Sequence, residues 1–158
     1  MARQRPKSRR VSDRGLLLMA ELRGEAALFL AWGLALAASL TVLFIGEVLG
    51  QAPCTLCWFQ RAFMFPLAVL LGLGLWWQDR SVARYAIALA GLGAVFALWH
   101  LALFVRLVPE QVQPCTATGP SCTDQNQLLF GVPIPALSLL SFGLIAALSA
   151  ISRKETPA

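Results

Sequence analysis

Two thiols and a permanent cation fall within eight consecutive residues of this chain. Cys54 and Cys57 are separated by two residues, and Arg61 follows Cys57 by four positions. If this stretch begins a helix, Cys57 and Arg61 lie on one face, because residues four apart are neighbours on a helix surface. A helix N-terminus and a nearby guanidinium both favour a thiolate over a thiol. The spacing therefore indicates a reactive cysteine, with Arg61 able to stabilise an anion beside it.

A second pair, Cys115 and Cys122, brackets six residues that include Gly119 and Pro120. A short segment of this composition can close a disulfide and still be reached by another protein. Taken alone, the pair is equally consistent with a structural staple of a loop and with a redox-active dithiol. If both pairs lie on one face of a membrane, a relay is favoured, because a thiolate of one pair can attack a sulfur of the other.

A zinc site is the main alternative for the cysteines. Cys-x-x-Cys can form half of a four-cysteine zinc site, or it can form a plain structural disulfide. The two pairs here have different spacings, with two residues between Cys54 and Cys57 and six between Cys115 and Cys122. Paired cysteines in an oxidising compartment also favour disulfides. We therefore expect redox chemistry and no bound metal.

The composition is that of a membrane protein. Of the 158 residues, 58% are hydrophobic and 13% are charged, and the mean hydropathy is +0.67. Soluble domains carry about 25% charged residues. The net charge of +5 and the pI of about 9.6 could indicate nucleic-acid binding. However, the basic residues cluster at the N-terminus and beside apolar runs, which is typical of membrane topology, so a lipid environment and no nucleic-acid partner are expected.

Four apolar runs are long enough to cross a bilayer. They predict an all-α integral membrane protein, with an antiparallel four-helix transmembrane bundle in residues 26–151. Cys54 and Cys57 come immediately before the second run. In the third run, small residues recur at helical spacing and predict a tightly packed face; they are Ala86, Ala90, Gly93 and Ala97. The expected spans are 26–45, 58–77, 85–105 and 133–151.

The Lys and Arg residues divide unequally between the two sides of this bundle. Residues 1–25, expected to be a disordered basic tail, hold seven of the thirteen, and the 78–84 turn and the 152–158 tail hold two each. Only Arg61 and Arg106 fall on the other side. The positive-inside rule then predicts that both termini are cytoplasmic. All four cysteines, including the pair in the 106–132 loop, are expected on the oxidising, extracytoplasmic face.

His100 is the only histidine, and it lies near the outer end of the third span, at about the depth of Arg61. It can be a buried imidazole bonded to a neighbouring helix. It can also be a hydrogen-bond donor or proton carrier for the carbonyl of a lipid-borne acceptor such as a quinone. The shared depth leaves the two interpretations about equal. Gln60 can hydrogen-bond across the bundle or to the same ligand.

Together, these residues resemble the DsbB family of membrane disulfide-generating oxidoreductases, and its shorter BdbC-type subgroup in particular. The resemblance rests on Pro53-Cys54-x-x-Cys57-Trp58-x-Gln60-Arg61, on His100 in the third span and on Pro114-Cys115-x6-Cys122. It covers roughly residues 26–151. It implies a bundle in the bacterial cytoplasmic membrane that oxidises an extracytoplasmic thioredoxin-fold (DsbA/BdbD-like) dithiol oxidase. The electrons would pass to a membrane quinone, ubiquinone or menaquinone, in support of disulfide bond formation in exported proteins.

The resemblance also implies roles for the site residues. Cys115 would be attacked by the partner's thiolate, and Cys122 would then exchange with Cys54. Cys57 would be released as the thiolate that faces the quinone. Arg61 would hold the quinone and its developing negative charge, with His100 and Gln60 as further candidates for the quinone site.

Two other functions compete with a quinone-dependent protein-disulfide oxidoreductase. A quinone reductase of the vitamin K epoxide reductase type has a similar bundle, but its Cys-x-x-Cys usually lies near the last helix, whereas here the motif opens the second span. A non-catalytic membrane protein with two structural disulfides predicts that both pairs resist mild reductant and that quinone has no effect. The thiol oxidase is the function that we expect.

Overall fold

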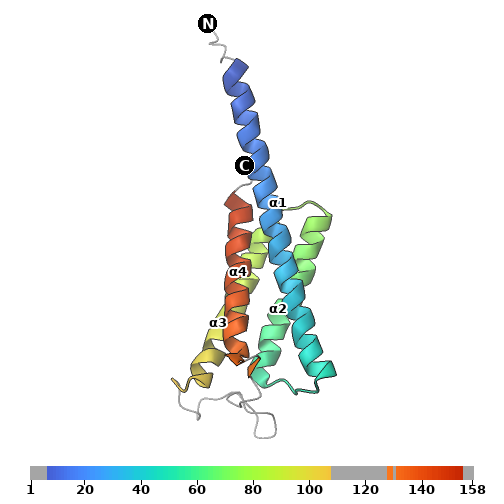
Figure 1. The fold of residues 1–158 in the computed structure, drawn as a ribbon, viewed down its shortest axis with the longest axis vertical. Helices are drawn as coiled ribbons and strands as arrows, with labels where there is room; N and C mark the ends of the chain where they lie inside the picture. The colour runs from blue at the N-terminus through green and yellow to red at the C-terminus, as the bar shows by residue number, and fades with distance from the viewer. Residues whose placement is uncertain (1–6, 108–127, 130, 155–158) are drawn as a thin grey trace.

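Four helices form an antiparallel bundle in the structure, which is a computed structural model (Figure 1). They are α1 (Lys7–Leu43), α2 (Thr55–Trp76), α3 (Val82–Phe104) and α4 (Ile134–Lys154). Each packs mainly against two others, in the ring order α1, α2, α3, α4, and α4 closes the ring against α1. The structure describes residues 7–107, 128–129 and 131–154.

All four helices are long and apolar enough to cross a membrane. The predicted four-helix membrane bundle is therefore confirmed. Helices α2 and α3 each begin three residues before the expected spans, and α4 continues three residues beyond its span. The helices exceed the apolar runs because polar residues such as Thr55 and Arg153 can continue a helix outside the hydrocarbon core.

Helix α1 differs most from the expectation. It begins at Lys7, so residues 7–25, expected to be a disordered tail, continue the first span as a helix. This segment contains no proline and is rich in Arg, Leu, Glu and Ala, which have high helix propensity. Figure 1 shows the N-terminal half of α1 extending beyond the other helices, at the end of the bundle where α4 ends.

Small residues allow the helices to approach closely. Gly93 of α3 faces the ring of Phe142 of α4, and a Cβ atom at position 93 would lie 2.3 Å from that ring. Phe142 is fully buried as a result. The predicted small-residue face of α3 is confirmed, since all four of its members are buried: Ala86, Ala90, Gly93 and Ala97. Side chains larger than alanine on this face would separate α3 from its neighbours.

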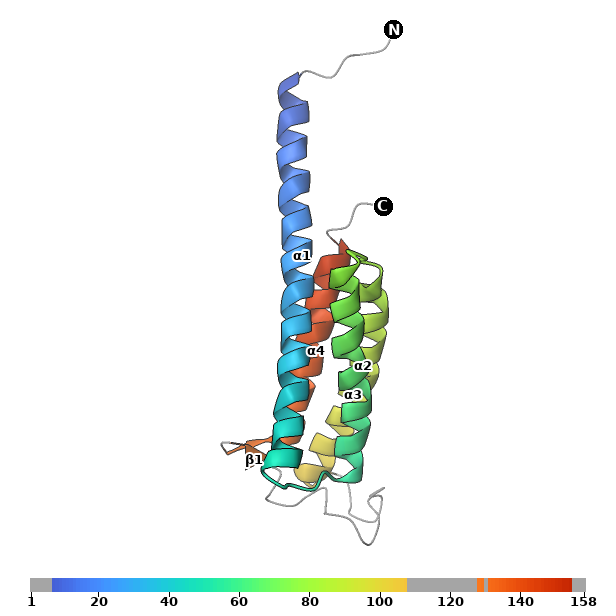
Figure 2. The same cartoon turned by 90° about the vertical axis from the view of Figure 1, so that its right-hand side faces the viewer.

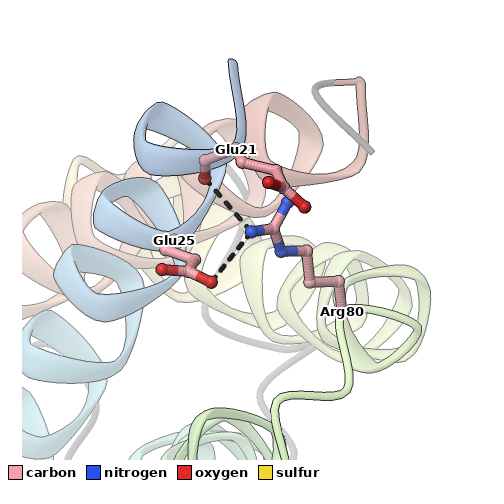
Figure 3. A network of polar contacts seen from close by, with 3 residues as sticks. All are labelled: Glu21, Glu25 and Arg80. Atoms are coloured by element: carbon pink, nitrogen blue, oxygen red, sulfur yellow. Dashed lines mark hydrogen bonds and ion pairs between the residues drawn. The ribbon is translucent and has the colours of Figure 1, made fainter. Parts of the chain in front are cut away.

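The turn between α2 and α3 is tied to α1 by one arginine. The Arg80 guanidinium donates to the backbone carbonyl of Glu21 at 3.1 Å and forms an ion pair with the Glu25 carboxylate at 3.0 Å (Figure 3). Glu25 is largely exposed, whereas the Arg80 side chain is mostly covered. This contact fixes the α2–α3 turn against α1 at the end of the bundle from which α1 extends.

The cysteine motif lies at the opposite end. There α1 passes into a five-residue π-helical turn, η1 (Phe44–Val48), and residues 49–54 lead into α2. A short hairpin, β1 (Leu128–Leu129) paired with β2 (Val132–Pro133), precedes α4 at the same end (Figure 2). This hairpin lies at the end of the predicted 106–132 loop, and its last residue, Pro133, belongs to the predicted fourth span. Cys115 and Cys122 lie outside the described residues.

Candidate functional site

Cys54 caps the N-terminus of α2. Its backbone is extended, at φ −71° and ψ 169°, and its sulfur accepts a hydrogen bond from the backbone N–H of Cys57 at 3.4 Å. The two sulfur atoms are 3.0 Å apart. Because the unpaired N–H groups of a helix start favour negative charge, this position stabilises a thiolate. The prediction that the motif opens a helix is therefore confirmed, with Cys54 as the cap.

On one side of the motif, Cys54 faces His100 of α3. The sulfur of Cys54 is 3.8 Å from Nε2 of His100, and both residues are buried. Nδ1 of the same ring is 3.0 Å from the side-chain nitrogen of Gln60. Gln60 therefore bonds across the bundle, from α2 to α3. His100 is thus a buried imidazole bonded to a neighbouring helix, and its role toward an acceptor stays a prediction.

On the other side, Cys57 faces a cavity of about 580 Å³ between α1, α2 and α4. The 50–53 segment closes one part of the wall. Gln60 and Arg61 also line the cavity, whereas Cys54 and His100 do not. Most of the remaining wall is aliphatic or aromatic, with Ile45, Leu137 and Phe142 among its members. Three of the predicted site residues, Cys57, Gln60 and Arg61, therefore line one apolar cavity. Cys54 and His100 lie outside its wall.

Arg61 is held against the end of α1. Its Nη2 atom donates to the backbone carbonyl of Val42 at 2.9 Å, and its guanidinium carbon lies 5.6 Å from the centre of the Trp58 ring. Within the part of the chain that the structure describes, no carboxylate lies within ion-pairing distance of it. The guanidinium is thus positioned by a carbonyl and an aromatic ring, and its charge is not neutralised by an acidic side chain.

Gly46, in the π-helical turn η1, is a site residue that the sequence analysis missed. A Cβ atom at this position would lie 3.2 Å from Nη2 and 3.4 Å from Nη1 of Arg61, which is tighter than ordinary contact. Any residue larger than glycine at position 46 would force the Arg61 guanidinium to shift. The sequence offered a single signal, a glycine at the end of an apolar run. The Val42 carbonyl offered none, because every residue has a backbone carbonyl.

The electrostatics of the reduced pair favour a thiolate at Cys54. The hydrogen bond from the Cys57 side chain lowers the pKa of the Cys54 thiol most, and the nearby His100 ring lowers it further. Burial of Cys54 opposes these effects and is outweighed by them. In the reduced pair, Cys54 is therefore the sulfur that loses its proton first. A thiolate within 3.0 Å of a second sulfur is the arrangement that disulfide formation and thiol–disulfide exchange require.

Comparison with known proteins agrees with this chemistry. The sequence model of the family described as "Disulfide bond formation protein DsbB" matches residues 24–152. A "Probable disulfide formation protein" from Metapseudomonas resinovorans is 54% identical over 130 residues, covering 82% of this chain and 90% of the relative. A protein of the same description from Deinococcus radiodurans is 37% identical, covering 83% of this chain and 91% of the relative.

A "Probable disulfide formation protein C 1" from Bacillus cereus is 36% identical over 141 residues, covering 85% of this chain and 97% of the relative. No solved structure matches the chain significantly. The family match includes all of α2, α3 and the cysteine motif and most of the membrane-spanning parts of α1 and α4. The chain therefore belongs to the DsbB family of disulfide bond formation proteins.

Proposed function

We propose that this chain is a quinone-dependent protein-disulfide oxidoreductase. It oxidises the dithiol of an extracytoplasmic thioredoxin-fold (DsbA/BdbD-like) oxidase and passes the two electrons to a membrane quinone. Family membership establishes the coarser function, disulfide formation by a multi-pass membrane protein. The observation that carries the finer proposal is the apolar cavity that places Cys57 beside Arg61.

The cavity fits a quinone headgroup. Its volume of about 580 Å³ lies in the range of small-molecule pockets. Its wall is mainly apolar, which suits a lipid-soluble ring, and Arg61 and Gln60 supply hydrogen-bond donors for carbonyl oxygens. When bound there, a quinone supplies a two-electron acceptor. Arg61 would hold an oxygen of this acceptor and stabilise the negative charge that reduction adds to it.

The cysteines carry the electrons to that cavity. A thiolate of the partner attacks Cys115, and the Cys115–Cys122 disulfide opens as the partner becomes oxidised. The Cys122 thiolate then attacks Cys54, which forms a Cys122–Cys54 bond, breaks the Cys54–Cys57 disulfide and leaves the Cys57 sulfur facing the cavity. The Cys115 thiolate attacks Cys122, which re-forms the Cys115–Cys122 disulfide and releases Cys54. Transfer of two electrons to the acceptor re-forms the Cys54–Cys57 disulfide, and the lowered pKa of Cys54 favours the thiolate that this step needs. His100 lies 3.8 Å from the Cys54 sulfur, within reach of the proton that Cys54 exchanges.

We also propose the orientation of the bundle. By sequence, the basic residues of segments 1–25, 78–84 and 152–158 fall on one side of the four membrane spans, and Arg61 and Arg106 fall on the other. This distribution supports a bacterial cytoplasmic membrane protein whose termini face the cytoplasm and whose cysteines face outward. A membrane-impermeant thiol reagent applied to intact cells should label the reduced cysteines. Labelling that needs inverted vesicles would contradict this orientation.

The function is tested with the purified chain in detergent, a reduced thioredoxin-fold partner and a soluble quinone. Quinone absorbance should fall, and disulfide should form in the partner in equal amount. Cys57→Ser should abolish quinone reduction, because no second sulfur remains to close the disulfide. The assay without partner is the control for direct reduction by the medium. A wild-type chain that reduces no quinone, or a Cys57→Ser chain with intact rate, would refute the proposal.

A further inference from the structure

We propose that Cys54, Cys57 and His100 form a binding site for a thiophilic divalent cation, such as Zn²⁺ or Cd²⁺, in the reduced state of the chain. The proposal goes beyond disulfide formation and does not depend on which acceptor takes the electrons. It rests on the position of His100, which joins the two sulfurs from a different helix. From the sequence, His100 was equally consistent with a buried structural imidazole and with an acceptor-site residue, and no metal was expected.

The three donor atoms already lie nearly as one ion requires. The two sulfurs and Nε2 of His100 all lie within 4.8 Å of one another. The sulfurs are 3.0 Å apart, and Nε2 is 3.8 Å from the Cys54 sulfur. In a tetrahedral zinc site with Zn–S of about 2.3 Å and Zn–N of about 2.0 Å, donor atoms lie roughly 3.5–3.8 Å apart. The two sulfurs would have to separate by about 0.8 Å to reach the S–S distance of such a site, which rotation of the Cys57 side chain about its Cα–Cβ bond can provide.

The donor set selects the class of ion. Thiolate and imidazole ligands are soft to intermediate, and they favour Zn²⁺ and Cd²⁺ over Mg²⁺ or Ca²⁺. Two cysteines and one histidine make a three-ligand site that leaves a fourth position open. Cys57 lines the cavity, whereas Cys54 and His100 do not. The open position can therefore be reached by water from the cavity side.

Gln60 supplies the outer-shell contact that such a site needs. Its side-chain amide lies 3.0 Å from Nδ1 of His100. If the Gln60 amide is turned by about 180°, its oxygen accepts a hydrogen bond from Nδ1–H of His100. Nε2 of His100 is then unprotonated, and its lone pair can bind the ion. Metal-bound histidines commonly have their second ring nitrogen fixed in this way. The same contact holds the ring plane toward the two sulfurs.

The metal site can form only when both cysteines are reduced, and its charge balance favours a divalent cation. Binding replaces the two thiol protons by one dication, so the cluster is neutral and two protons are released. Neutrality matters because Arg61, a fixed cation, lines the cavity next to Cys57. In the disulfide form neither sulfur is a thiolate, and the site is lost. An ion bound to both thiolates also blocks their oxidation, so occupation of the site should inhibit turnover.

The test uses the full chain in detergent with Cys115→Ser and Cys122→Ser, so that only one dithiol is present. The chain is reduced, freed of reductant and titrated with Cd²⁺, with the near-ultraviolet sulfur-to-cadmium absorbance as the readout. We expect one ion per chain in the reduced form and no binding after the Cys54–Cys57 disulfide is closed. His100→Gln should weaken binding by about 100-fold or more, and Gln60→Leu by about 10-fold. Ser138→Ala, at the cavity wall, is the matched control and should bind as the parent does.

Three results would overturn the proposal. Unchanged affinity in a His100→Gln chain that keeps its helical circular dichroism would mean that the dithiol alone holds the ion. One ion for every two chains would mean that the ion cross-links molecules. Equal binding by the oxidised and reduced parent would mean that the ion binds elsewhere. If His100→Gln does not fold, the oxidised and reduced parents and Gln60→Leu decide the matter, since unchanged affinity in Gln60→Leu would also contradict it.

Discussion

The two ends of the bundle each hold an arginine, and the two are used differently. At one end Arg80 pairs with the Glu25 carboxylate and a backbone carbonyl, which ties the α2–α3 turn to α1. At the other end Arg61 is positioned by the Val42 carbonyl and the Trp58 ring. Among the described residues no carboxylate pairs with Arg61. The charge of Arg80 is therefore used to stabilise the fold, whereas the charge of Arg61 remains available to bind an anion.

A membrane bundle can thus hold a cation in place without neutralising its charge. A backbone carbonyl at a helix end offers a partial negative charge, which is enough to orient a guanidinium. A carboxylate would orient it equally well but would compete with a bound anion. The cavity wall beside Cys57 thus retains a net positive charge.

The largest effect is expected from removal of the Arg61 charge. Arg61→Leu should raise the apparent KM for quinone by about 10- to 100-fold, since a hydrogen bond to a charged group contributes about 1.5–3 kcal/mol. Steady-state kinetics at varied quinone concentration measures this. Arg80→Leu is the matched control, and its KM should stay at the parent value. Equal KM values for the two variants would remove Arg61 from the acceptor site.

A smaller effect is expected on the titration of Cys54. Its pKa is lowered by Cys57 and then by His100, so its thiolate should persist at pH values below the ordinary range of a cysteine. His100→Gln removes one of these causes, so the pKa should rise and the thiolate should be lost at a higher pH. Thiolate absorbance against pH, in the reduced chain with Cys115→Ser and Cys122→Ser, measures the change. A midpoint that does not move would show that His100 has no influence on Cys54.

A few-fold effect is expected from Gly46→Ala. The added Cβ would lie 3.2 Å from Nη2 of Arg61, so the guanidinium must shift by a few tenths of an ångström. The apparent quinone KM should rise by about fivefold, since misplacement of a positioning group by 1 Å can cost about 100-fold. Gly33→Ala, on α1 and open to its surroundings, is the matched control. If both variants behave alike, the close approach at Gly46 does not position Arg61.

The smallest effect is expected at the other end. Glu25→Gln breaks an ion pair whose acidic partner is 59% exposed, and such pairs contribute roughly 0.2–1 kcal/mol. The midpoint of thermal unfolding in detergent should fall slightly, and the quinone KM should not change. A changed KM would mean that the two ends are coupled, which the separate contacts of the two arginines do not suggest.

Much of the fold could be predicted because the bilayer restricts it. Long uncharged runs gave the four spans, and the spacing of Ala86, Ala90, Gly93 and Ala97 gave the packed face of α3. The helical start at the cysteine motif also followed from the sequence. The helical extension of α1 did not, because a charged segment with high helix propensity has no apolar period that distinguishes a helix from a coil.

The site was predicted only in part, because some of its features depend on how the helices pack and not on residue type. Side-chain types revealed Cys54, Cys57 and Arg61, but not that the motif has two sides. The division between a cavity beside Cys57 and a buried ring beside Cys54 depends on how α3 is rotated, which spacing within α2 cannot tell. Val42 and Gly46 act through a carbonyl and through the lack of a side chain, and neither has a chemical signature.

The contact between Gly93 and Phe142 fixes α3 against α4, and these two helices flank in sequence the segment that contains Cys115 and Cys122. In the proposed relay, both cysteine pairs belong to one chain, so exchange between them is unimolecular. The rate of this exchange should therefore be independent of protein concentration, whereas exchange with free thiols should rise with thiol concentration.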